Sequence, residues 1–180
     1  MSSKKKYIIT SITLGTIAAV SAGLIGLTNL LTRDQIAANA TKKINAGISE
    51  IFGKNASISQ ELTYKDSGLT GDYKYIEYVY SVSDDANQDL GYAFKTTGSN
   101  MYGKISLIIG FAETDHSFLG LSIVVNEQTY ASTLVDKYIN PLNDGTRELD
   151  DVTCGATYGA KLVKEMVDIS RSAAEELWKD

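Results

Sequence analysis

The chain has 180 residues, of which 43% are apolar and 22% charged, with a single proline and a single cysteine. This composition excludes a disordered chain, a collagen-like chain and a disulfide-stapled scaffold. The length is sufficient for one globular domain with an attached segment. The only charges in the first 32 residues are Lys4, Lys5 and Lys6, and the rest of the chain carries 22 acidic against 14 basic residues. Such an acidic body excludes nucleic acid as the expected partner.

An uncharged segment runs from Tyr7 to Thr32. About 20 helical residues cross a bilayer core, so this segment is long enough to span a membrane. The lysines before it and Arg33 after it favour a cytoplasmic N-terminus. We therefore expect a cytoplasmic tail at 1–6, a single-pass transmembrane anchor at 7–32, and the remaining chain on the outer face of the cell membrane.

A cleaved signal peptide is the alternative for this segment. The residues from Val20 to Ala22 are of the small kind that signal peptidases accept. The apolar run continues beyond them from Leu24 to Leu31, which favours an uncleaved anchor.

After the anchor, the apolar residues first have the spacing of a helix and then the pattern of β-strands. Apolar residues predict an amphipathic helix from Asp34 to Phe52, with Asp34 at its N-terminus and Gly53 at its end, within a connecting segment at 33–58. Runs of β-branched and aromatic residues then predict strands. The expected strands are 73–82, 91–98, 104–111 and 119–126.

Helical features return in the C-terminal third of the chain. Alternation is lost from 127 to 150, where we expect a short helix near 132–138 and a chain break at Pro141. One apolar face predicts an amphipathic helix from Ala160 to Trp178. Strands followed by a closing helix indicate an α+β fold, with a mostly antiparallel sheet packed with helices, in a domain at 59–180.

Counting excludes several common kinds of active site. His116 is the only histidine and Cys154 the only cysteine. The sequence therefore contains no recognisable set of ligands for a tetrahedral zinc site. A Ser-His-Asp triad would have one possible base, and no nucleophile motif accompanies it. We expect neither a metal site nor a catalytic residue.

The run DVTCGAT, from Asp151 to Thr157, stands apart because it lies directly before the last helix. Unpaired N–H groups at a helix N-terminus suit a phosphate, and Gly155 and Ala156 allow an anion to approach the backbone. Thr157 adds a hydroxyl at the same point. The residues alone favour a simple helix cap for Thr157, because serine and threonine commonly cap helices.

The same run resembles the motif D-x-x-x-G-A-T/S of the FMN-binding domains that carry covalently bound FMN. This family includes the G subunit of the Rnf electron-transport complex and the C subunit of the sodium-translocating NADH:quinone oxidoreductase. The resemblance also includes the N-terminal membrane helix, the LTRDQIA segment after it, the tyrosine-rich strand and the segments GYAFKTTG and KISLIIGF. It thus covers nearly the whole chain, in order.

The resemblance implies that FMN is joined to Thr157 by a phosphoester bond, which a separate flavin transferase makes. It implies further that Asp151 is the acid that the transferase requires and that Gly155 and Ala156 fill the small positions. Loops at 98–103 and 127–130 are expected to hold the flavin ring. Tyr102 and Tyr130 could stack near it, although a tyrosine in a β-rich domain is more often simply packed. The other expected cofactor-binding residues are Gly103, Glu127, Thr129 and Cys154.

Two segments depart from the family pattern. The family shows Glu-Thr-Pro-Gly after the fourth strand, where this chain reads NEQTY from Asn126 to Tyr130. The family commonly continues with Ser or Thr after the motif threonine, where this chain has Tyr158 and Gly159. The intact spacing within DVTCGAT predicts that attachment is retained, and the altered segments leave the ring contacts open.

By this resemblance the chain is expected to be an electron-transferring flavoprotein subunit, without turnover of its own, in an Rnf-type ion-translocating oxidoreductase complex. Its partners would be the membrane subunits of that complex. Two alternatives stay open at this point: a stand-alone extracellular flavin reductase or electron shuttle, and an unflavinylated anchored binding module.

Overall fold

The computed structural model describes residues 3–179 and contains two compact units, Met1–Lys42 and Lys43–Asp180. Helix α1 (Ser3–Phe52) makes up the first unit and continues into the second. Over the described part of the chain, α1 is the one helix that is long and apolar enough to cross a membrane, within Ser11–Thr32. This N-terminal apolar helix suggests a membrane anchor.

The expected helix start at Asp34 is wrong, because α1 is continuous from Ser3 to Phe52. The alanine-rich segment after Thr32 contains neither proline nor glycine before Gly47, so nothing in it interrupts a helix. The expected end is confirmed: Gly53 has a φ of 102° and its N–H donates to the Ser49 carbonyl at 3.1 Å. The expected membrane orientation depends on the charged side chains at positions 4–6 and 33, and the expected helix start on that at position 34. The structure describes the backbone of these residues but not their side chains.

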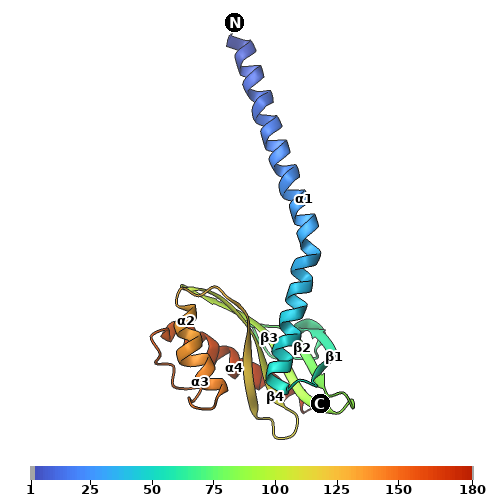
Figure 1. Ribbon diagram of the computed structural model, residues 1–180, viewed down its shortest axis with the longest axis vertical. Helices are drawn as coiled ribbons and strands as arrows, with labels where there is room; N and C mark the ends of the chain where they lie inside the picture. Colours follow the sequence, from blue (N-terminus) through green and yellow to red (C-terminus); the bar gives the residue numbers. More distant parts are fainter. Residues whose placement is uncertain (1–2, 180) are drawn as a thin grey trace. The chain divides into compact units, whose positions relative to one another are not determined.

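A single five-stranded antiparallel sheet forms the centre of the second unit (Figure 1). Each strand pairs with the next one along the chain, in the order β1-β2-β3-β4-β5. This arrangement confirms the predicted α+β fold with an antiparallel sheet and packed helices. The strands are β1 (Ser57–Thr63), β2 (Ile76–Ser83), β3 (Asp89–Asn100), β4 (Gly103–Ala112) and β5 (Phe118–Asn126).

The sequence pattern misses β1 and places the start of β2 too early. β1 reads SISQELT and is mostly exposed at the sheet edge, so it lacks the apolar alternation of an inner strand. A short 3-10 helix, η1 (Tyr64–Asp66), follows it. Tyr73 and Tyr75 precede β2 and donate hydrogen bonds to carboxylates of the last helix. These tyrosines therefore join the segment before β2 to that helix and are not part of the strand.

Both faces of the sheet are covered, as alternate residues of β4 show. Leu107 and Ile109 are fully buried in the larger core cluster, on the face that carries the C-terminal helices. Ile108 is fully buried in the smaller cluster, where it packs with Ile48 from the last turns of α1. Burial on both faces explains why β4 reads as a continuous apolar run.

A short helical segment follows β5 and comprises α2 (Ala131–Leu134), η2 (Val135–Ile139) and α3 (Asn140–Asn143). The expected helix near 132–138 is therefore present, but the expected chain break at Pro141 is wrong. Pro141 lies in the first turn of α3, where a missing N–H is tolerated. The wider π-helical turn of η2 precedes it.

Helix α4 (Thr157–Leu177) lies across the same sheet face as α2 and α3 (Figure 1). Its apolar stripe is buried against β3 and β4, as the amphipathic pattern predicts. A Cβ at Gly98 of β3 would lie 2.9 Å from Leu162 Cδ1 and 3.1 Å from Met166 Sδ. The glycine thus permits the close approach that sets the position of α4, and with it that of Thr157 at the helix start.

The far end of α4 is fixed by the Glu176 carboxylate. It accepts hydrogen bonds from Thr70 N at 2.6 Å, from Thr70 Oγ1 at 2.7 Å and from Tyr73 Oη at 2.5 Å. Donation by Tyr73, and then by Thr70, lowers the pKa of Glu176 from 4.5 to about 2. The ionised carboxylate is therefore the form that the fold stabilises.

Replacing Glu176 by glutamine is expected to lower stability at neutral pH but not in acid. Because the folded pKa is depressed, the contribution of Glu176 is fully present above pH 4.5 and is lost as the pH falls towards 2. Urea unfolding of both proteins between pH 7 and about pH 3 checks this linkage. Glu175→Gln is the matched control, and a wild-type advantage that does not shrink in acid would contradict the assignment.

Candidate functional site

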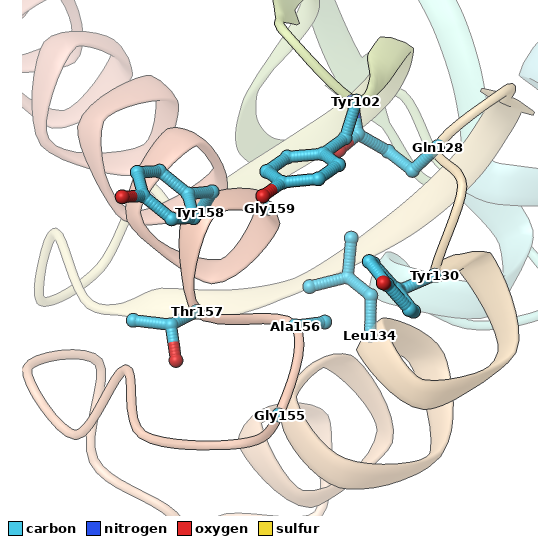
Figure 2. A pocket seen from close by; sticks show the side chains of 9 residues that line it. All are labelled: Tyr102, Gln128, Tyr130, Leu134, Gly155, Ala156, Thr157, Tyr158 and Gly159. Atoms are coloured by element: carbon cyan, nitrogen blue, oxygen red, sulfur yellow. The ribbon is translucent and has the colours of Figure 1, made fainter.

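A surface pocket of about 260 Å³ opens at the start of α4. Three segments form it: the first turn of α4, the β3–β4 turn and the stretch between β5 and α2 (Figure 2). Its lining consists of Tyr102, Gln128, Tyr130, Leu134, Gly155, Ala156, Thr157, Tyr158 and Gly159.

The N-terminus of α4 offers unused hydrogen-bond donors to this pocket. Ala156 is the N-cap residue and supplies no capping side chain. The helix ladder begins with the N–H of Ala160, which donates to the Ala156 carbonyl at 3.0 Å. The N–H groups of residues 157–159 therefore precede the first bond of the helix and have no partner within it.

Thr157 is half-buried at this helix start. Ala156, not Thr157, is the N-cap residue of α4, and no described residue forms a hydrogen bond with Thr157 Oγ1, so the side chain does not perform the simple helix-cap function. In Figure 2 the hydroxyl points away from the tyrosine rings of the pocket, towards the loop that precedes α4. The oxygen is thus a free group at the edge of the pocket.

Backbone conformation explains the small residues before Thr157. Gly155 has a φ of 80°, in the left-handed region that disfavours residues with a Cβ. Ala156 is buried and belongs to the larger core cluster. These two residues turn the chain tightly into α4, and both line the pocket.

Ionic contacts hold the loop before α4. Arg147 Nη1 donates to the Asp151 carbonyl at 2.7 Å and lies 3.3 Å from the Asp151 carboxylate. Lys164 Nζ lies 2.5 Å from Asp168 and 3.0 Å from Asp150. The hydrogen bond to Asp168, and then that to Asp150, raises the pKa of Lys164. The loop is therefore tied both to itself and to the second turn of α4.

Tyrosine rings form the other wall of the pocket. The Tyr102 ring lies 5.7 Å from that of Tyr130 and 5.5 Å from that of Tyr158, measured between centroids. Tyr130 and Tyr158 are 51% and 59% exposed. Figure 2 shows Tyr102 between the other two rings, so the three aromatic side chains form one continuous cluster at the mouth of the pocket.

Hydrogen bonds fix the turns that carry these rings. Asn100 accepts from Tyr102 N at 2.8 Å and donates to the Tyr158 carbonyl at 3.1 Å. Thr129 donates to the Tyr102 carbonyl through its N–H at 2.8 Å and through Oγ1 at 3.1 Å. The β3–β4 turn is thereby joined to both other segments of the pocket.

Five of the residues named from the motif and the resemblance line this pocket: Tyr102, Tyr130, Gly155, Ala156 and Thr157. The other five do not. Cys154 is buried in the core, Asp151 is exposed on its loop, and Glu127 is exposed beside the pocket. Gly103 and Thr129 shape the neighbouring β3–β4 turn. Gly103 has a φ of 130°, and Thr129 donates a hydrogen bond to the Tyr102 carbonyl.

The expected site residues did not include Gln128, Leu134, Tyr158 and Gly159, which line the pocket. Gln128 is only 7% exposed and stands between two residues that were expected to contact the ring. Tyr158 carried a signal, because it replaces a small hydroxyl residue next to the motif threonine. Leu134 had no signal, since its position depends on how α2 packs.

The arrangement suits a phosphate and a flat aromatic ring. Free N–H groups at a helix N-terminus bind anions, and the helix dipole adds to the attraction. The tyrosine cluster provides the apolar, aromatic surface that ring ligands need. These features suit a ligand that combines an anionic group with a flat ring.

Comparison with known proteins addresses the N-terminal part of the chain. Residues 1–51 match the family model described as the RnfG N-terminal region. A search of curated proteins finds no match. The matched segment includes most of α1 and lies outside the pocket. Over this segment the chain is similar to the N-terminal region of RnfG.

Proposed function

We propose that the chain is a membrane-anchored flavoprotein subunit that relays electrons through FMN covalently attached to Thr157. The subunit would belong to an Rnf-type ion-translocating oxidoreductase complex, with no turnover when isolated. Its N-terminus would be cytoplasmic and its FMN-binding domain, at 59–180, would lie on the outer face of the membrane. The observation that carries the proposal is the start of α4, where Ala156 supplies no capping side chain and the N–H groups of residues 157–159 precede the first helix bond. Among the described residues, Thr157 Oγ1 has no hydrogen-bond partner.

Attachment requires a phosphoester bond between Thr157 Oγ1 and the phosphorus of FMN. In this step Thr157 Oγ1 attacks the flavin-side phosphorus of a flavin dinucleotide bound to the separate transferase. The P–O–P bond breaks, and the nucleoside monophosphate leaves with the proton of the hydroxyl. Asp151 lies beside Arg147 on the exposed loop. It would contact the transferase rather than the bound flavin. This explains how a motif acid can lie outside the pocket.

The chain's own residues would then bind and position the cofactor. Bound FMN supplies the capacity to accept and donate electrons. The N–H groups of residues 157–159 would donate to the phosphate, and Gly155 would permit its close approach to the backbone. A covalent bond also keeps the cofactor on a domain exposed to the surroundings.

The direct test is to load the full-length chain with flavin. Co-expression with a flavin transferase, followed by a denaturing gel under ultraviolet light, is expected to give a fluorescent band of this chain. The same chain expressed without the transferase is expected to stay dark. A dark band in cells where the transferase labels an established substrate would reject the proposal and favour an unflavinylated binding module.

A further inference from the structure

The two departures from the family pattern meet at one place in the structure. Tyr130 lies in the segment that replaces Glu-Thr-Pro-Gly, and Tyr158 replaces the hydroxyl residue after the motif threonine. They are separated by 27 residues in sequence, yet both rings contact Tyr102. The two segments thus place aromatic residues on one wall of the pocket.

These rings are available for a ligand. Tyr130 and Tyr158 belong to the small set of large apolar side chains that the second unit exposes, within its described residues. No hydrogen bond engages the hydroxyls of Tyr102, Tyr130 or Tyr158 in the described part of the chain. The aromatic faces and the phenol groups are therefore not used by the fold itself.

Gln128 adds a polar group to the aromatic wall. Its side chain is more than nine-tenths buried, and its Nε2 donates to the Gly103 carbonyl. This bond fixes the amide, so Oε1 faces the first turn of α4, where a Cβ on Gly159 would lie 3.4 Å away. Oε1 accepts no hydrogen bond from any described residue, and it remains a fixed acceptor in the pocket.

We propose that Tyr102, Tyr130 and Tyr158 form the surface that binds the isoalloxazine ring of the flavin, and that Gln128 Oε1 accepts a hydrogen bond from a ring N–H. This inference rests on the proposed function and goes beyond it by adding Tyr158 and Gln128 as ring contacts. An electron-poor, flat ring with N–H groups is the ligand class that electron-rich phenol rings and a single amide acceptor suit. The aromatic cluster thus takes the place of the missing Glu-Thr-Pro-Gly segment.

Flavin fluorescence in the folded, loaded chain tests this assignment. A phenol ring that contacts a flavin quenches its emission, so the native full-length protein in detergent is expected to be weakly fluorescent. In Tyr158→Leu and in Tyr130→Leu the emission per bound flavin is expected to rise above that of the wild type, because each substitution removes one of the quenching rings. Tyr158→Trp is expected to keep the flavin quenched.

Tyr78→Leu is the matched control, because Tyr78 packs with Tyr80 on the opposite face of the sheet. It is expected to leave the emission unchanged. The flavin content of each variant is measured on the denatured protein, so a failure of attachment is separated from a failure of ring binding. Equal emission per bound flavin in the wild type and both leucine variants, or an equal rise in Tyr78→Leu, would overturn the inference while leaving attachment to Thr157 intact.

Discussion

Replacing Thr157 by alanine is expected to abolish covalent flavin on this chain completely. The phosphoester needs a hydroxyl oxygen, and alanine removes that atom without changing the helix start. Thr157→Ser keeps the hydroxyl and is expected to retain the flavin. Gel fluorescence under denaturing conditions and the intact mass of the purified chain both report the outcome, since attachment adds the mass of one FMN less one water.

Thr153→Ala is the matched control for this experiment, because Thr153 lies on the same loop and is exposed. It is expected to label like the wild type. Thr157 makes no capping hydrogen bond, so its truncation is expected to change the free energy of unfolding by no more than about 0.5 kcal/mol. A fluorescent Thr157→Ala band would mean that flavin attaches elsewhere.

Truncating Leu107 to alanine is expected to lower the free energy of unfolding of the second unit by about 2–5 kcal/mol, because a fully buried leucine leaves a cavity. This is a large share of the roughly 5–15 kcal/mol that stabilises a typical domain. Urea unfolding of the full-length protein in detergent, followed by the fluorescence of Trp178, measures the change. Trp178 is the only tryptophan of the chain and contacts Tyr92 and His116 within this unit.

Leu119→Ala is the control for the core substitution, because Leu119 lies on the neighbouring strand but is 39% exposed. Its effect is expected to be well below that of Leu107→Ala. Similar losses for the two variants would contradict the assignment of Leu107 to the main core.

Elements with strong local signals could be predicted from the sequence. The inner strands and α4 carry long apolar patterns, and Gly53 marks the end of α1. The edge strand β1 could not be found, since an exposed strand needs no apolar alternation. The continuity of α1 through Asp34 was missed because charge and polarity were interpreted as a helix boundary, although neither one breaks a helix.

The candidate site divides in the same way. Thr157, Gly155 and Ala156 form one contiguous run, so their joint position at a helix start followed from their order. Tyr158 and Gln128 required the fold, because their meeting with Tyr102 depends on the β3–β4 turn and on the path of the chain from β5 to α2. Asp151 shows the reverse: it belongs to the motif in sequence but not to the pocket in space.

Peptide mapping of the flavin-loaded chain tests the central assignment most directly. Trypsin cleavage after Arg147 and Lys161 releases the segment 148–161, which contains the whole motif and the start of α4. The account predicts that this peptide carries the mass of FMN less one water and that its fragment ions place the addition on Thr157. An addition on Thr153 or on another peptide, or an unmodified 148–161 peptide in a loaded chain, would contradict it.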